Sequence, residues 1–335
     1  MPANGAADTG PGTGAELAFL YPGALETPTG GYVYDRQLLA ALCDIGIQVD
    51  ARSLGEGYPA PAPRVLAGAE RMLAGLPDGQ AVMIDGLAFG VMADVARPHA
   101  ERLRLVALVH HPLAHESGIP AARAAELLAS ERAALALARH VVTTSHATAA
   151  ALAGGFKVPS GKITVLEPGL TVQCVKDRSP CDHDDGGPLR LLAVGSLIPR
   201  KDYPTLLAAI ARLSDRALRL DIVGSAAFDP ACAAGIEAEI GRLGLGARVR
   251  LHGALEREAL DALYAQADIF TLTTLYEGYG MAFAEAMAHG LPVIATGEGA
   301  VRDTVPPPAG MVLAAGGIGG GAGGIARLCG DAGLG

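Results

Sequence analysis

The feature that most constrains the fold is an alternation of apolar strand-like segments and helix-like segments that occurs twice along this 335-residue chain. In the first half, segments such as AELAFLYPG, AVMIDG and RLVALVHH read as strands, with helical stretches between several of them. The alternation restarts at LRLLAVG and continues to PVIAT. Strands that alternate with helices form parallel sheets covered by helices on both faces. The sequence therefore predicts an α/β fold with two doubly wound sheets.

Composition places the domain boundaries. Residues 173–188, QCVKDRSPCDHDDGGP, are polar, rich in Pro and Gly and without periodicity, which is typical of a linker. We expect Rossmann-like domains at 15–172 and 189–314, facing each other across a central cleft. Residues 1–14 are expected to form a disordered lead. Residues 315–335 read as a glycine-rich, apparently truncated tail.

The bulk chemistry excludes several classes of protein. A net charge of −9 disfavours a nucleic-acid partner, because phosphate backbones require a surface rich in Lys and Arg. Five scattered cysteines without a CxxC pair read as reduced thiols. The first fourteen residues lack the charged and apolar regions of a signal peptide, and the uncharged run at 309–326 is too rich in glycine for a membrane helix. We expect a soluble, cytoplasmic chain without a transmembrane segment.

A glycine turn follows the first strand, in LETPTGGYVYD. At Gly30 and Gly31 the missing Cβ atoms would let backbone N–H groups approach an anion at a helix N-terminus. The dinucleotide fingerprint GxGxxG is absent from this turn, and GGGAGG at 319–324 has too few residues after it for a βαβ unit. An NAD-dependent oxidoreductase is therefore disfavoured, while an ordinary glycine turn remains open.

Two cations lie between a strand and a helix in AVGSLIPRKDYPTLL. At that position Arg200 and Lys201 would neutralise a departing diphosphate. The alternative for this pair is two surface cations.

The most informative stretch, LYEGYGMAFAEAMAHGLPVIAT, carries two acids eight residues apart. We expect Glu277 in a loop after a strand and Glu285 about one turn into the next helix. A carboxylate accepts from two vicinal hydroxyls, such as those of a ribose. The loop and the first helical turn supply glycines and free amides that would face phosphate oxygens; these candidates are Gly278, Gly280, Met281 and Ala282.

Histidines end a strand in LVALVHHPLAHESG. We expect His110 and His111 on the same side as the other candidates, where a histidine would bond a sugar hydroxyl or the reaction centre. The pair His115 and Glu116 matches no common spacing of metal ligands, and DHD at 182–184 lies in the linker. We predict no metal site.

Taken together, the glycine turn, the strand-ending histidines, the Arg-Lys pair and E-x7-E resemble the retaining glycosyltransferases of the GT-B fold, family four (glycosyl transferases group 1). The resemblance covers roughly residues 15–314, and YEGYGMAFAEAMAHGLPVIAT is its most specific part. The chain departs from the family at Ser196, where an arginine is frequent, and at Thr171, where an aspartate is common. It also ends after a Pro- and Gly-rich region that follows Val305, without the family's last helices.

The resemblance implies roles for these residues. Arg200 and Lys201 would bind the donor diphosphate, Glu285 the ribose, and Glu277 would lie near the transferred sugar. His110 would be the N-terminal histidine near that sugar. Gly30 and Gly31, the glycines of the first turn, would shape the diphosphate and acceptor side of the site.

The implied reaction is transfer of a hexosyl group with retention, from a nucleoside-diphosphate sugar to a small-molecule, glycan or lipid-linked acceptor. It would need neither a metal nor a cofactor. The alternative is a non-catalytic or truncated GT-B protein that binds a nucleotide sugar or a partner without turnover.

Overall fold

The computed structural model describes residues 15–170 and 187–314. The predicted lead, nearly all of the predicted linker and the predicted tail lie outside these residues. So do the DHD and GGGAGG segments and Thr171. The domain boundaries placed on these segments therefore stay predictions.

The N-terminal half contains a parallel six-stranded sheet with the order β2-β1-β3-β4-β5-β6. Its strands are β1 (Leu17–Tyr21), β2 (Val49–Ser53), β3 (Ala81–Asp85), β4 (Arg104–Val109), β5 (His140–Thr143) and β6 (Ile163–Val165). Its helices are α1 (Gly30–Asp44), α2 (Pro63–Ala74), α3 (Gly86–Phe89), α4 (Ala93–Ala96), α5 (Ala121–Leu137) and α6 (His146–Gly154), with 3₁₀ turns η1 (Arg97–His99), η2 (Leu113–His115) and η3 (Ser160–Lys162). The strand order reverses between β1 and β3.

The C-terminal half repeats this architecture in the order β12-β11-β10-β7-β8-β9, again with parallel pairing. Its strands are β7 (Leu189–Val194), β8 (Leu218–Val223), β9 (Val249–Leu251), β10 (Ile269–Glu277), β11 (Val293–Gly299) and β12 (Gly310–Leu313). Its helices are α7 (Tyr203–Arg212), α8 (Pro230–Arg242), α9 (Arg257–Gln266), α10 (Met281–Ala288) and α11 (Val301–Thr304), with η4 (Pro199–Lys201). Here the order reverses between β7 and β10.

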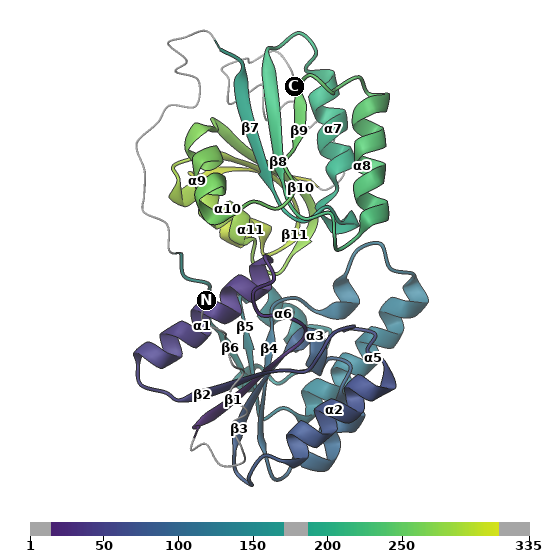
Figure 1. Cartoon of the computed structure of the whole chain (residues 1–335), viewed down its shortest axis with the longest axis vertical. Coiled ribbons are helices and arrows are strands. Elements are labelled where there is room, and N and C mark those ends of the chain that lie inside the picture. Colours follow the sequence, from purple (N-terminus) through teal and green to yellow (C-terminus); the bar gives the residue numbers. More distant parts are fainter. Residues whose placement is uncertain (1–14, 171–186, 315–335) are drawn as a thin grey trace, which may run out of the picture.

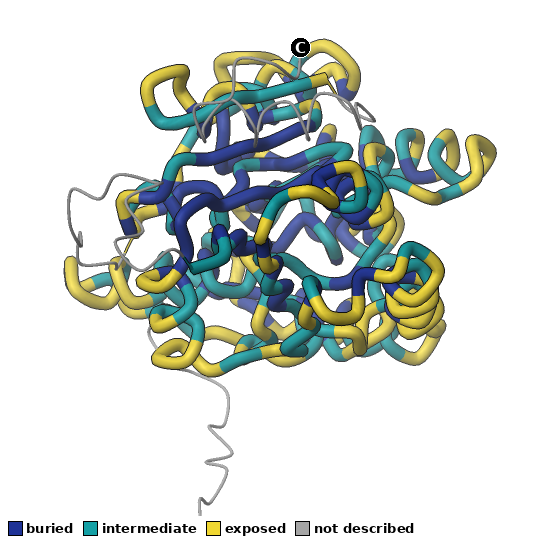
Figure 2. Tube along the Cα trace, turned by 90° about the horizontal axis from the view of Figure 1, so that it is seen from above, coloured by how far each residue is buried: buried dark blue, intermediate teal, exposed yellow. Residues whose placement is uncertain are grey.

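Each half has its own core, because parallel strands are buried on both faces. In β4 the apolar run is almost fully buried, and α7 buries a stripe that includes Leu206, Leu207 and Ile210. A fully buried leucine contributes about 1.5–3 kcal/mol to stability. Figure 2 shows this buried interior covered by helices whose outer faces are exposed. The predicted α/β fold with two doubly wound sheets is confirmed.

The two halves lie one above the other, with the carboxyl ends of both sheets facing the region between them (Figure 1). In open parallel sheets ligands bind at the strand ends, at the point where the strand order reverses. Both reversal points therefore present their loops to the same region. No helix among the described residues is long and apolar enough to span a membrane.

Candidate functional site

An acid and two cations meet at the reversal point of the C-terminal sheet. Glu277 was expected in a loop, but β10 continues three residues beyond the predicted strand and ends with Glu277. Arg200 and Lys201 end η4, the turn that follows β7. The Lys201 Nζ lies 2.5 Å from Oε1 of Glu277, and Nη1 of Arg200 lies 3.2 Å from its Oε2. Glu277 is only 6% exposed, so its charge depends on these two partners.

The electrostatics follow from that burial. Burial alone would raise the pKa of Glu277, but Lys201 and Arg200 lower it to about 2, so the carboxylate is ionised at neutral pH. Burial lowers the pKa of Lys201, although Glu277 opposes the shift. For Arg200 burial also acts against the charge, yet Glu277 and Glu116 raise its pKa. The three groups form a charged cluster that excludes most solvent.

Threonines of β10 hold the turn that carries both cations. The hydroxyl of Thr274 donates to the carbonyl of Arg200 at 3.0 Å, and that of Thr273 donates to the carbonyl of Asp202 at 2.8 Å. Asp202 has φ +44°, a backbone conformation that residues other than glycine rarely adopt. The turn is thus fixed to the strand that supplies Glu277.

The second acid of the motif is held separately. Glu285 lies in α10, as expected, and its Oε1 accepts from Nη1 of Arg257 at 3.0 Å while its Oε2 accepts from the hydroxyl of Tyr264 at 3.2 Å. Both partners come from α9. Glu277 and Glu285 therefore bond different groups, although both flank the start of α10.

The loop between the two acids is built from glycines. Gly280 has φ +98° and precedes α10, and a Cβ at this position would lie 2.6 Å from the ring of Phe283. Met281 and Ala282 form the first turn of α10, where backbone N–H groups have no acceptor within the helix. A Cβ on Gly278 would lie 1.9 Å from the carbonyl oxygen of His110, which shows how closely the two halves approach.

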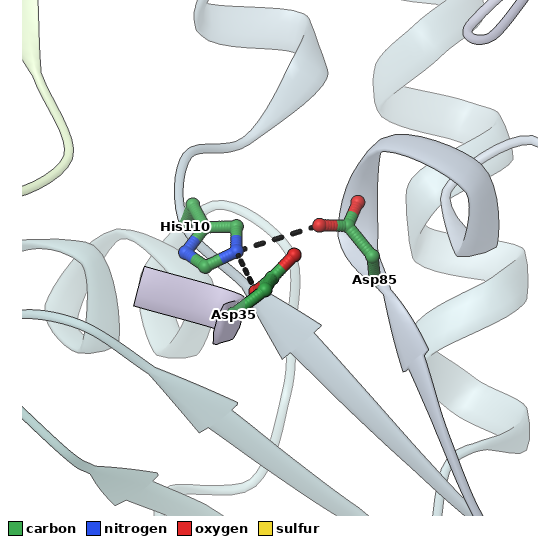
Figure 3. Close-up of side chains that lie close together, drawn as sticks. All are labelled: Asp35, Asp85 and His110. Carbon is green, nitrogen blue, oxygen red and sulfur yellow. Dashed lines mark hydrogen bonds and ion pairs between the residues drawn. The ribbon is translucent and has the colours of Figure 1, made fainter. Parts of the chain in front are cut away.

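From the N-terminal half, His110 follows β4, and two acids approach the same nitrogen of its ring (Figure 3). Its Nε2 is 2.9 Å from Oδ1 of Asp35 and 3.4 Å from Oδ2 of Asp85. Burial alone would lower the pKa of His110, but Asp35 and Asp85 raise it to about 10. The glycines of the first turn begin α1: Gly31 lies against the ring of His110, and Gly30 lies against Met281.

Further contacts join the halves around His111. Its Nε2 lies 3.4 Å from Oε2 of Glu116, and its ring packs against that of Tyr276 with centroids 5.1 Å apart. Oε1 of Glu116 in turn accepts from Nε of Arg200 at 3.2 Å. The hydroxyl of Thr148 donates to the carbonyl of Gly278 at 3.2 Å. Thus the predicted histidines and the predicted cation pair lie on opposite sides of one contact region.

One group of side chains has ligand atoms close enough for a metal ion in the part of the chain that the structure describes. It consists of Asp35, Asp85 and His110, whose ligand atoms lie within 4.8 Å of one another. His115, which was considered as a metal ligand with Glu116, packs its ring between Phe156 and Tyr276.

Sequence reasoning missed several of these partners. Asp85 had a signal, because it ends an apolar strand in AVMIDG and caps α3 by accepting from the amide of Leu87. Asp35 and Arg257 had none, since each lies among other charged residues in an ordinary helix. Glu116 was considered only as a metal ligand and not as a partner of Arg200.

The fold and the facing strand ends define the class of protein: two doubly wound parallel domains of this kind constitute the GT-B fold. Sucrose-phosphate synthase from Thermosynechococcus elongatus has the same fold, with a TM-score of 0.76 at 22% identity, covering 94% of this chain and 90% of that one. Anabaena HepE, solved in complex with UDP and glucose, has a TM-score of 0.67 at 18% identity, covering 95% of this chain and 91% of that one.

Sequence comparison adds the family. The model of the family "Glycosyl transferases group 1" matches residues 188–331. The MMP α-(1→4)-mannosyltransferase of Mycolicibacterium hassiacum is 28% identical over 265 residues, which is 75% of this chain and 61% of that protein. The chain therefore has the GT-B fold, its C-terminal half matches the group 1 glycosyltransferase family, and its match spans about three fifths of that relative's length.

Proposed function

We propose that this chain transfers a hexosyl group from a nucleoside-diphosphate sugar to an acceptor hydroxyl, with retention at the anomeric carbon and without a metal or cofactor. The observation that carries the proposal is the buried cluster of Arg200, Lys201 and Glu277 at a sheet reversal point, opposite His110. The UDP and glucose bound by HepE support a nucleotide-sugar donor for a chain of this fold. The cytoplasmic location expected from the sequence stays a prediction.

Arg200 and Lys201 retain N–H groups that can donate hydrogen bonds to a diphosphate. A lysine has three N–H donors and an arginine five. Lys201 uses one of its donors on Glu277, and Arg200 places Nε on Glu116 and Nη1 on Glu277 and the carbonyl of Tyr276. Among the described residues Nη2 of Arg200 donates no hydrogen bond. Cations held in a site with little water stabilise a leaving diphosphate more strongly than cations in water.

In the proposed reaction the bond between the anomeric carbon and the diphosphate oxygen breaks, and its electron pair leaves with the diphosphate. The acceptor oxygen forms its new bond on the same face, and its proton passes to a leaving phosphate oxygen. Arg200 and Lys201 stabilise the charge that develops on the phosphate, and Glu277 holds both cations in place. Contact between the halves excludes water, which would otherwise hydrolyse the donor.

The first test is a calorimetric and thermal-shift screen of the chain against UDP, GDP, ADP and TDP, with and without EDTA. Selective stabilisation by one diphosphate that EDTA does not remove is expected. It should weaken about tenfold in Glu285→Gln, whose ribose contact is altered, and not in Glu258→Gln, an exposed residue of α9. Binding of none of the four would contradict the proposal.

A second measurement separates transfer from binding alone. The diphosphate that binds is supplied as its sugar conjugates, and release of free diphosphate is followed in the absence of acceptor. Slow hydrolysis that requires Lys201 supports a catalyst. Tight binding without any hydrolysis or transfer, across sugar conjugates and acceptors, supports the non-catalytic alternative.

A further inference from the structure

Two carboxylates approach His110, whereas a single hydrogen-bond acceptor is enough to orient a neutral imidazole. Asp35 is fully buried in α1 and Asp85 is 4% exposed at the end of β3, and both carboxylates approach the same ring nitrogen. In Figure 3 the two acids lie on one side of the imidazole, and its other nitrogen, Nδ1, lies on the opposite side. Two neighbouring buried carboxylates are costly unless a positive charge compensates them.

Geometry fixes each acid. Asp85 is held because its Oδ1 accepts from the amide of Leu87 at 2.7 Å. Asp35 is fixed by α1, and among the described residues its Oδ2 has no hydrogen-bond partner. The ring of Tyr34 meets that of His110 edge-on, with centroids 5.2 Å apart. The imidazole therefore has little freedom to turn, and Nε2 is committed to the acids.

We propose that Asp35, together with Asp85, is a positioning residue that holds His110 as a doubly protonated imidazolium, with Nδ1–H directed at the donor substrate. In this state His110 is a charged hydrogen-bond donor and not a base. The natural acceptors for such a donor are a sugar hydroxyl or a phosphate oxygen. The assignment of the target rests on the proposed function, whereas the charge state of His110 does not.

The titratable groups that face His110 support this state. Asp35 and Asp85 are the acids, and the tyrosines nearby, Tyr34 and Tyr32, have pKa values raised to about 12, because they are buried and lie near the acids, so they stay neutral. Burial and the neighbouring carboxyl of Asp85 raise the pKa of Asp35, and His110 opposes that shift. From the C-terminal half the backbone at Gly278, which carries no charge, approaches the carbonyl oxygen of His110.

The same three side chains match a metal site in composition, but the hydrogen bond argues for a proton. At 2.9 Å from Oδ1 of Asp35, Nε2 makes an ordinary hydrogen bond, and a protonated Nε2 has no lone pair for a metal. The test below therefore includes metal ions as a competing occupant.

The experiment is NMR titration of the full chain with ¹⁵N-labelled histidine, from pH 5 to pH 10, without donor. The signals of His110 are assigned by their absence in His110→Gln. We expect both ring nitrogens to stay protonated up to at least pH 8.5. In Asp35→Asn the titration midpoint should fall from about 10 to within pH 6.5–8.5, a change of more than tenfold in the protonation equilibrium.

Two further variants keep the test decisive if Asp35→Asn does not fold. Asp85→Asn keeps an oxygen for the amide of Leu87 and should lower the midpoint as well. Asp221→Asn is the matched control, because Asp221 bonds Nε2 of His252 at 2.6 Å in the other half, and it should leave His110 unchanged. An ordinary midpoint near 6.5 for His110, or no change in either acid variant, would overturn the proposal. Broadening of its signals by micromolar Mn²⁺, reversed by EDTA, would also overturn it in favour of a metal site.

The functional arm measures rates against pH with the donor found above. In the natural chain, kcat/KM should not fall through deprotonation of His110 as the pH rises from 6.5 to 8.5. In Asp35→Asn, kcat/KM should fall within that range, because His110 loses its proton there. A merely structural role would lower the rate at all pH values equally and would count against the proposal. If no transfer is found but His110 shows the expected raised midpoint by NMR, the proposed function is overturned and the charged state of His110 is retained.

Discussion

Arg200 and Glu116 form an ion pair that joins the two halves of the molecule: Nε of the arginine lies 3.2 Å from Oε1 of the glutamate. Burial alone would raise the pKa of Glu116, but His111 and Arg200 lower it to about 2. Its negative charge therefore offsets part of the positive charge that a diphosphate would meet at Arg200.

Removal of that charge should strengthen diphosphate binding. In Glu116→Gln we expect the dissociation constant of the nucleoside diphosphate to fall about fivefold, or about 1 kcal/mol, measured by calorimetry. Glu126→Gln, an exposed residue of α5, is the control. Weaker binding in Glu116→Gln would mean that the pair orients Arg200 more than it neutralises it.

A glycine limits how closely the halves approach. A Cβ on Gly278 would lie 1.9 Å from a backbone oxygen of His110, and a change of rotamer cannot relieve this overlap. We expect Gly278→Ala to separate the halves while each half stays folded, at a cost of about 1–3 kcal/mol. Small-angle scattering should show a larger radius of gyration. Gly235→Ala is the control, because Gly235 lies in α8 with open space around it, and it should leave the radius unchanged.

Glu131 ties α5 to the loop that follows His110. Its two oxygens accept from the amides of Leu113 and Ala114 at 2.7 and 2.9 Å. Burial raises its pKa to about 7, although both amides oppose the shift. The folded chain then holds this proton more tightly than the unfolded chain. The stability that results is present below about pH 4.5 and is lost as pH rises through about 7.

Urea denaturation at pH 5 and pH 8 tests this prediction. The free energy of unfolding of the natural chain should fall relative to that of Glu131→Gln by about 1–3 kcal/mol between the two pH values, since one pKa unit corresponds to about 1.4 kcal/mol. The exposed control on the same helix, Glu126→Gln, should keep the full pH dependence. Parallel pH profiles for the natural chain and Glu131→Gln would show that the Glu131 carboxyl titrates normally.

Lys201 should act mainly after the donor has bound. Its Nζ lies 2.5 Å from Glu277 and would face charge that develops on the diphosphate. In Lys201→Met we expect kcat to fall about 10²–10³-fold while the affinity for the diphosphate falls much less. Single-turnover kinetics with donor and acceptor would check this. An exposed lysine supplies the control, Lys157→Met. A loss of affinity with kcat unchanged would assign Lys201 to binding alone.

Much of the fold could be predicted because its signals are local. The alternation of apolar strands and helices depends on neighbouring residues, and it placed both sheets correctly. The position of Glu277, Arg200 and Lys201 at strand ends follows from the same alternation, since the ends of parallel strands share one edge of a sheet.

The partners of these residues could not be predicted in the same way. Asp35 meets His110 across 75 positions of sequence, and Glu116 meets Arg200 across 84. Such contacts depend on how α1 packs on its sheet and how the two halves dock. The spacing of eight between Glu277 and Glu285 suggested one shared ligand. In the structure Glu277 bonds the two cations of η4 and Glu285 bonds Arg257, because a glycine turn and the first turn of α10 lie between the two acids.

The threonines of β10 that clamp the η4 turn have a consequence for the order of events. They make Arg200, Lys201 and Glu277 parts of one rigid body, to which His110 does not belong. If the halves separate, Arg200 and Lys201 would still be in place to bind the donor diphosphate. His110 and the acceptor side would then lie away from the donor. We therefore expect an ordered mechanism in which the donor binds before the acceptor. In product-inhibition kinetics the free diphosphate should then compete with the donor and not with the acceptor.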